Sequence, residues 1–291
     1  MGNIIGLGEA LWDMLPEGKR IGGAPANFAY HCMQFGHKAT AVSAVGKDEL
    51  GKKLVEQLKA RGLELEMPAI DFPTGVVKIS LTEDGIPDYD ICRNVAWDYI
   101  PFTPEMNQLA QSADAVCFGS LAQRFFVSRD CISRFLDIMR GNCNTLRVFD
   151  LNLRQDFYDC NIVGNSLHCC NVVKLNDEEL PIVVRMFSIK GDSAKQQCRN
   201  LMERFGLKMA ILTCGTRGSY IFAQDTTSFV ETPLVEVADT VGAGDSFSGA
   251  FIGSLLNGKT IHDAHTTAVR ISAYVCTQNG AMPDIPRSLT I

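Results

Sequence analysis

The segment from Asp239 to Phe247 holds the residues whose types and spacing most directly suggest chemistry. A turn of small residues, Gly242-Ala243-Gly244, runs into Asp245, and a helical pattern follows from Ser246 to Leu256. The first N–H groups of a helix have no partner within the helix and carry partial positive charge, so such a turn favours phosphate. A carboxylate beside phosphate makes sense if it takes the proton of an attacking hydroxyl, the role that we predict for Asp245. The alternative is a glycine-rich turn in which Asp245 only caps the helix.

A second glycine-rich segment lies near the N-terminus. Asp13 is followed by Gly22-Gly23-Ala24-Pro25-Ala26-Asn27, so polar side chains flank two glycines. Glycine lets the backbone approach a ligand closely. A sugar needs several fixed hydrogen-bonding partners for its hydroxyls, and this segment would supply them. The alternative is a solvated loop that leads into a helix.

Polar side chains also follow three predicted strands. Arg154 ends the sequence Asp150-Leu151-Asn152-Leu153-Arg154 and is suited to neutralising phosphate charge. Asn176 and Glu179 follow the next strand, where they would organise magnesium through water or, alternatively, cap a helix. The turn Thr213-Cys214-Gly215-Thr216-Arg217-Gly218 ends a further strand, and its alternative is a simple hairpin connection.

Two other glycine motifs approach nucleotide-binding signatures but lack a required residue. Residues 46–53 come close to G-x-x-x-x-G-K-[ST], yet Lys53 replaces the hydroxyl residue that would hold magnesium. Gly6 and Gly8 are followed by Leu11 where the dinucleotide fingerprint needs a third glycine. A dinucleotide-dependent oxidoreductase is therefore disfavoured.

The elements that must position these residues alternate between strands and helices. Strands are predicted at 4–7, 40–45, 113–118, 146–150, 172–175 and 209–213, and helices at 25–35, 48–61, 128–140, 156–168, 177–187 and 193–205. This alternation predicts an α/β fold with a central, mostly parallel sheet flanked by helices on both faces, and ligands bind beyond the carboxyl ends of such strands. Residues 74–91 alternate with period two around Asp84-Gly85, which predicts a β-hairpin and a candidate lid.

Bulk composition narrows the partners of the protein. The net charge of −6 and the pI of about 5.4 argue against nucleic acid. No apolar run reaches the length of a bilayer and the N-terminus has no secretory pattern, so we expect a cytoplasmic protein that does not bind membranes. The eleven cysteines include no C-x-x-C pair, which is typical of reduced thiols rather than of disulfides or zinc.

Taken in order along the chain, these motifs resemble the signatures of the ribokinase-like (PfkB) family of sugar and nucleoside kinases. The resemblance runs from Ile4 to about Pro283 and includes Asn279-Gly280-Ala281. Residues 22–29 and Val95-Ala96-Trp97-Asp98 look most like bacterial fructokinases. The resemblance implies one ribokinase-like kinase domain over 1–291, with a small β lid formed mainly by about 74–93 plus N-terminal segments.

The resemblance also implies an activity, ATP-dependent phosphorylation of a primary hydroxyl of a sugar, most closely that of fructose to fructose 6-phosphate. It assigns catalysis to Asp245, Gly242, Ala243, Gly244 and Arg154, substrate binding to Asp13, Gly22, Gly23, Asn27 and Arg93, and nucleotide binding to Lys174, Asn176, Thr213, Gly215, Gly218 and Asn279. Mg²⁺ is expected at Asn176 and Glu179 through water, and a monovalent cation such as K⁺ near Asp239 and Thr240.

Several alternatives stay open at this point. A kinase of the same family for 2-keto-3-deoxygluconate, ribose or a nucleoside would carry the same motifs. A non-catalytic sensor of sugars or nucleotides would be expected to lack Asp245. A homodimer through the lid is a further expectation, because an isolated hairpin is only marginally stable and one of its faces needs cover.

Overall fold

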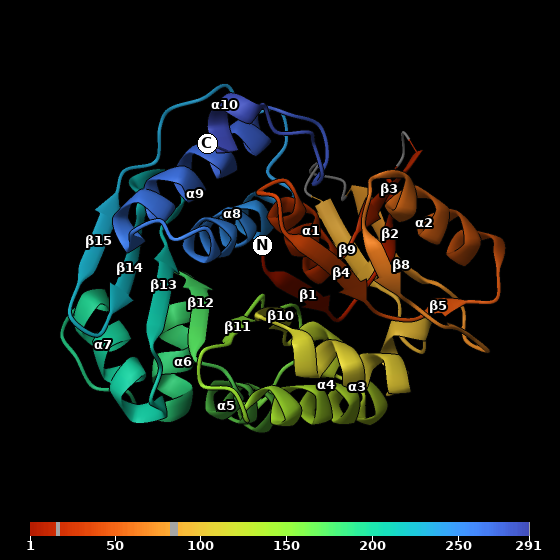
Figure 1. Ribbon diagram of the computed structural model, residues 1–291, viewed down its shortest axis with the longest axis horizontal. Coiled ribbons are helices and arrows are strands. Elements are labelled where there is room, and N and C mark those ends of the chain that lie inside the picture. Colours follow the sequence, from red (N-terminus) through yellow and green to blue (C-terminus); the bar gives the residue numbers. More distant parts are fainter. Residues whose placement is uncertain (16–17, 82–86, 291) are drawn as a thin grey trace.

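A large sheet runs through the centre of the protein (Figure 1). The computed structural model describes residues 1–15, 18–81 and 87–290, and within them nine strands form this sheet in the order β15-β14-β13-β12-β11-β10-β1-β4-β6. Its strands are β1 (Asn3–Leu7), β4 (Lys38–Val42), β6 (Glu64–Glu66), β10 (Ala115–Gly119), β11 (Leu146–Asp150), β12 (Val172–Asn176), β13 (Met209–Thr213), β14 (Ser219–Ala223) and β15 (Thr227–Val230). All neighbours from β13 to β6 pair in parallel, and β14 and β15 add an antiparallel edge. The predicted mostly parallel sheet is confirmed.

Helices cover both faces of the large sheet, as predicted (Figure 1). One face carries α1 (Ala24–Met33), α8 (Ala243–Leu256), α9 (Ile261–Cys276) and α10 (Arg287–Thr290). The other face carries α3 (Pro104–Ser112), α4 (Phe126–Met139), α5 (Cys160–Cys169), α6 (Glu179–Phe187) and α7 (Ala194–Phe205). The remaining helix, α2 (Glu49–Ala60), lies beside a second, smaller sheet.

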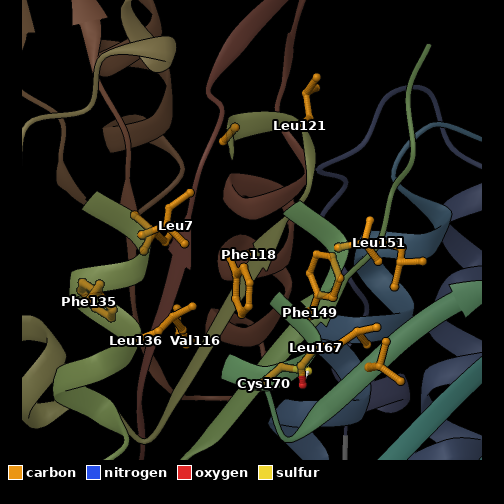
Figure 2. Close-up of a cluster of buried hydrophobic side chains, with 14 of the residues drawn as sticks. Leu7, Val116, Phe118, Leu121, Phe135, Leu136, Phe149, Leu151, Leu167 and Cys170 are labelled. Atoms are coloured by element: carbon orange, nitrogen blue, oxygen red, sulfur yellow. Dashed lines mark hydrogen bonds between the residues drawn. The ribbon is translucent and has the colours of Figure 1, made fainter. Parts of the chain in front are cut away.

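Among the described residues, two hydrophobic cores lie on opposite faces of the large sheet, and a third includes Trp12 of the smaller sheet and Leu54 and Leu58 of α2. Because successive side chains of a strand point to opposite faces, neighbours such as Ile4 and Ile5 enter different cores. Figure 2 shows part of the core beneath α4 and α5, where the rings of Phe118 and Phe149 stack with their centroids 5.3 Å apart. Buried apolar surface on both faces explains why the strands read as continuous apolar runs rather than as alternating ones.

The smaller sheet has the order β3-β2-β8-β9. Its strands are β2 (Leu11–Leu15), β3 (Gly18–Gly22), β8 (Gly75–Leu81) and β9 (Pro87–Ile91). Strands β8 and β9 pair antiparallel from Val77 opposite Ile91 to Leu81 opposite Pro87, so the predicted hairpin is confirmed in its strands. The predicted turn at Asp84-Gly85 lies outside the described residues. N-terminal segments complete this sheet, since β2 runs parallel to β8 and antiparallel to β3.

Some element boundaries differ from the prediction. The strand expected at 40–45 is divided: β4 ends at Val42, and β5 (Val45–Gly46) pairs instead with β7 (Ala69–Ile70). The helix expected from residue 156 begins at Cys160, because the Asp159 side chain accepts a hydrogen bond from the Ile162 N–H at 2.8 Å and so caps α5. All eleven cysteines are free. None of the described helices is both long and apolar enough to span a membrane.

The carboxyl ends of the parallel strands meet at one edge of the large sheet. The register pairs Gly119 with Asp150, Asp150 with Lys174, and Asn176 with Thr213. Motifs that are far apart in sequence therefore converge at this edge, where ligands bind in open α/β sheets.

Candidate active site

The start of α8 has the backbone geometry of the predicted anion site. Its N-cap residue, Gly242, has a φ of 78° and supplies no side-chain cap. A Cβ at this position would lie 2.6 Å from the Cβ of Ala281, so both the left-handed backbone and the close packing require glycine. The Ala243 N–H donates to the Thr240 carbonyl at 3.3 Å. The N–H groups of Gly242 and Gly244 have no hydrogen-bond acceptor outside the helix among the described residues, so they are free to face a ligand.

The carboxylate of Asp245 lies one residue beyond this turn and is oriented by a second helix. The Nδ2 of Asn27 on α1 donates to the Asp245 Oδ2 at 2.7 Å, and Asn27 is 3% exposed. This contact joins the two glycine-rich segments of the sequence across α1 and α8. Burial, with a further contribution from Asp150, raises the pKa of Asp245 to about 6, although Asn27, Lys174 and Arg154 oppose the rise. A carboxylate with this pKa is ionised at neutral pH and still basic enough to accept a proton.

A buried ion pair lies against the same turn. The Nζ of Lys174 contacts Asp150 Oδ1 at 3.0 Å and Oδ2 at 2.8 Å. A Cβ on Gly244 would be 3.1 Å from this Nζ, so the absence of a side chain there leaves room for the lysine. Burial lowers the pKa of Lys174, but Asp150, Glu179 and Asp245 together outweigh it and raise the pKa above the ordinary value. Lys174 thus stays cationic beside the anion site.

Asn176 and Glu179 cap the start of α6, the alternative that the sequence left open. The Oδ1 of Asn176 accepts from the Glu178 and Glu179 N–H groups, while the two Glu179 oxygens accept from Asn176 and Leu153 at 2.9 Å each. Direct coordination of Mg²⁺ would compete with these bonds, whereas contact through water uses the remaining lone pairs. Among the described residues, no three His, Cys, Asp or Glu side chains are grouped so that they would hold a metal. The lone pairs that these hydrogen bonds leave free on Asn176 and Glu179 are able to accept from the water of a hydrated ion.

Asp13 lies on the smaller sheet, near the loop that precedes α8. A Cβ on Gly22 would be 2.5 Å from the Asp13 Oδ2, so Gly22 makes room for this carboxylate. Burial and the neighbouring Asp239 raise the pKa of Asp13 to about 6, and Arg20 opposes the rise. Asp13 is thus partly shielded from water.

The residues predicted to hold a monovalent cation are already paired. Asp239 Oδ2 accepts from Arg20 at 3.0 Å and from the Gly280 N–H at 3.1 Å, and Oδ1 accepts from the Val241 N–H at 3.0 Å. Thr240 is exposed and contributes its carbonyl to the Ala243 N–H. A guanidinium and two backbone N–H groups therefore already contact the Asp239 carboxylate, and the predicted cation site stays a prediction.

The two predicted arginines occupy different places. Arg154 is exposed, yet its charge lowers the pKa of Asp245, which places it near the anion site. Arg93 instead pairs with Asp156 at 3.2 Å and lies over the ring of Phe157. No described contact joins Arg93 to Asp13 or Asn27.

The remaining predicted nucleotide residues lie in two loops. Gly215 and Gly218 belong to the connection between the antiparallel strands β13 and β14, so the hairpin alternative describes this turn correctly. Gly218 has a φ of 116°, and a Cβ there would lie 2.6 Å from the Val230 carbonyl. Thr213 ends β13, with Asn176 opposite it on β12. Asn279 is exposed in the loop after α9.

Two carboxylates near this site were not predicted from the sequence to have a role. Asp150 appeared only as the first residue of a motif, and its signal is a charged residue at the end of an apolar strand. Glu9 follows β1 in the same way, is 3% exposed, and lies close enough to Asp245 for the charge of that residue to raise the pKa of Glu9. Both could have been found by asking which acidic residues end a buried strand.

The comparisons with known proteins place the chain in a class that acts on carbohydrates. Residues 17–288 match the model described as pfkB family carbohydrate kinase, and the chain belongs to this family. The predicted family resemblance is thereby confirmed.

Relatives and solved structures are similar over nearly their whole length. Probable fructokinase-5 of Arabidopsis thaliana is 28% identical, with 97% of this chain and 94% of the relative covered. An ATP-dependent 6-phosphofructokinase of Thermoanaerobacterium thermosaccharolyticum is 26% identical, with 99% and 92% covered. The crystal structure of Vibrio cholerae fructokinase in its fructose-, ADP- and calcium-bound form superposes with a TM-score of 0.83 at 21% identity, with 100% of this chain and 98% of that chain covered.

Proposed function

We propose that this carbohydrate kinase transfers the γ-phosphoryl group of ATP to a primary hydroxyl of a sugar, and that the sugar is fructose, phosphorylated at O6. The observation that carries the proposal is the junction of the two glycine-rich segments. Asn27, from the segment predicted to bind sugar, holds the carboxylate of Asp245 at 2.7 Å, directly beside the open N–H groups of α8. The proposed base, an amide from the proposed sugar segment and the proposed anion site therefore lie together.

In this proposal Asp245 takes the proton from the attacking hydroxyl. As that oxygen forms its bond to the γ-phosphorus, the bond from phosphorus to the β–γ bridging oxygen breaks and ADP leaves. The N–H groups of Gly242 and Gly244 would stabilise charge on the transferring group, and because they are fixed by the fold they need no reorganisation. Lys174 and Arg154 add positive charge near the same turn.

In this proposal magnesium contacts the protein through its bound water molecules rather than through direct side-chain ligands. Bound near Asn176 and Glu179, it would offset negative charge on the ATP phosphates. The protein side of this contact is rigid, because both residues cap α6.

Fructose is the favoured sugar for two reasons. The Arabidopsis relative is described as a probable fructokinase, and the Vibrio structure contains fructose. In this chain the Oδ1 of Asn27 is buried without a hydrogen-bond donor among the described residues, and Asp13 presents a second acceptor. Two acceptors fit a ligand with several hydroxyls.

An assay of ADP release across a panel of acceptors tests the proposal. The panel contains fructose, ribose, 2-keto-3-deoxygluconate, adenosine and, because one relative is a 6-phosphofructokinase, fructose 6-phosphate. We expect the highest kcat/KM with fructose. Another acceptor would leave buried polar groups of the site without partners, so its transition state would be bound more weakly. A tenfold preference for another acceptor would overturn fructose but keep the kinase. No transfer to any of them would overturn the proposed function.

We further propose that the β8–β9 hairpin closes over the sugar and contributes to a homodimer. Phosphoryl transfer to a hydroxyl competes with transfer to water, so the open edge of the sheet needs cover during the reaction. Hydrogen exchange over residues 74–93 should slow when fructose binds, and sedimentation should show a dimer. Exchange that fructose leaves unchanged would exclude closure, and a monomer would exclude the dimer.

A further inference from the structure

His265 is a buried histidine that the proposed reaction does not use. It lies on α9, where its Nε2 is 2.7 Å from the Ser219 Oγ and its Nδ1 is 2.9 Å from the Ser228 Oγ. All three residues are at most 5% exposed. Ser219 begins β14 and Ser228 lies in β15, so one side chain of α9 contacts both antiparallel strands at the edge of the large sheet.

The ring of His265 is neutral at physiological pH. Burial and the neighbouring His262 lower its pKa to about 4. A neutral imidazole has one N–H donor and one acceptor nitrogen, and a serine hydroxyl is able to act as either partner. The two serines therefore satisfy both ring nitrogens, and removal of the ring would take a hydrogen-bond partner from two buried hydroxyls.

Ser219 directly follows the nucleotide turn, the name used here for residues 213–218. Strand β14 pairs with β13 so that Ser219 lies opposite Thr213, and the two strand ends that carry the turn therefore meet at this serine. The chain after β15 contacts the same turn, because the Thr232 hydroxyl donates to the Gly215 carbonyl at 2.7 Å. The ring thus contacts both the strand that leaves the nucleotide turn and the strand whose extension binds to it.

Helix α9 also packs against α8, the helix that carries the proposed base (Figure 1). The ring of Phe247, two residues after Asp245, meets the His265 ring edge-on, with the centroids 5.8 Å apart. Further along α9, the Ser272 hydroxyl donates to the Ala243 carbonyl at 2.9 Å. One helix therefore contacts both the strands of the nucleotide turn and the turn at the start of α8. Phosphoryl transfer needs this alignment, since a displacement of about 1 Å is able to cost about 100-fold in rate.

We propose that His265 is a positioning residue for the nucleotide, which fixes β14 and β15 against α9 so that the nucleotide turn keeps its place relative to the start of α8. The ring acts through the turn and touches neither ATP nor the sugar. Because the turn is ordered in advance, ATP does not have to order it on binding. This inference rests on the proposed function, to which the binding of ATP by the turn belongs.

The first test measures ATP binding by calorimetric titration in the wild type, His265→Leu and His265→Gln. Leucine offers no polar atom, whereas the amide of glutamine supplies one donor and one acceptor. We expect His265→Leu to bind ATP about tenfold more weakly, through the loss of two hydrogen bonds, and to keep the KM of the sugar within about threefold. His265→Gln should stay within about threefold of the wild type in both quantities.

The matched control for a general loss of stability is Ile271→Ala. Ile271 is fully buried on the same helix, and its truncation leaves a cavity without removing a polar group. This variant should unfold at lower urea concentration and still bind ATP within about threefold of the wild type. The proposal is overturned if Ile271→Ala loses as much ATP affinity as His265→Leu, or if His265→Gln binds ATP as weakly as His265→Leu. Equal changes in the KM of ATP and of the sugar in His265→Leu would overturn it as well.

The second test needs no ligand and so separates this inference from the proposed function. Hydrogen exchange over residues 213–219 should be about threefold or more faster in His265→Leu than in the wild type, and His265→Gln should restore the slower rate. Ser219→Ala removes only the contact with β14 and should give the same faster exchange, which provides a readout if His265→Leu does not fold. Unchanged exchange in the folded variants would refute the positioning role whatever the substrate is. Faster exchange in the variants of a protein that does not bind ATP would refute the proposed function, and with it the nucleotide role of the turn.

Discussion

Replacing Asp245 by asparagine is the most direct test of the proposed chemistry. The substitution keeps the size of the side chain and an oxygen that still accepts the hydrogen bond of Asn27, whose Nδ2 lies 2.7 Å from the Asp245 Oδ2. It removes only the ability to take a proton. Loss of a general base costs about 10²- to 10⁴-fold in turnover, or about 3 to 5 kcal/mol of transition-state free energy. We expect Asp245→Asn to lose this much kcat while its affinity for ATP stays within about threefold of the wild type.

The structure also predicts how Asp245→Asn changes the free energy of unfolding relative to the wild type. The pKa of Asp245 rises from 3.8 to about 6 on folding, mainly through burial, so the folded protein is penalised for the charge once the pH rises through this interval. A pKa that differs by one between the folded and unfolded states corresponds to about 1.4 kcal/mol, which sets an upper limit of about 3 kcal/mol here. Asp245→Asn should therefore unfold at higher urea concentration than the wild type at pH 7 and show no such gain near pH 3.5.

The assay pairs single-turnover ADP formation with calorimetric titration of ATP. Wild-type kcat/KM should fall by about tenfold for each pH unit below 6, because protonation of Asp245 removes the base. The exposed Asp225→Asn provides the matched control and should change neither rate nor stability. Near-normal turnover of Asp245→Asn at pH 7 would refute the role of Asp245 as the base. A variant that is less stable than the wild type at pH 7 would refute the conclusion that burial destabilises the charged carboxylate.

Further substitutions probe the surroundings of the site. Arg124→Met should destabilise the fold by about 3 to 5 kcal/mol in urea unfolding, because it leaves the fully buried Asp98 unpaired, and a loss below about 1 kcal/mol would contradict this. Gly242→Ala should lower kcat at least tenfold, since a φ of 78° and the close packing at the turn oppose a side chain; unchanged single-turnover rates would count against the turn. Gly22→Ala should raise the KM for sugar about tenfold more than the KM for ATP, because its Cβ would displace Asp13; equal changes would remove Asp13 from the sugar site.

The sequence by itself determined the class of fold and the edge at which the site forms. Alternating strands and helices leave few arrangements other than a parallel sheet covered on both faces, and such a sheet aligns its carboxyl ends. Asp150, Asn176 and Thr213 therefore had to lie near one another, as the strand register shows. The place of Asp245 could be predicted because a glycine turn before a helical pattern marks the start of a helix, where α8 indeed begins.

Only the tertiary structure decided which distant side chains meet. The bond between Asn27 and Asp245 joins residues 218 positions apart and depends on the packing of α1 against α8. The same holds for the ion pair between Arg20 and Asp239, residues 219 positions apart, which lies at the predicted cation site. Glu9 was assigned no role from the sequence, because its burial and an Oε2 without a partner among the described residues are properties of the space around the residue. The local sequence determines which chemistry a side chain is able to perform. Its neighbours in space determine its protonation state and its orientation.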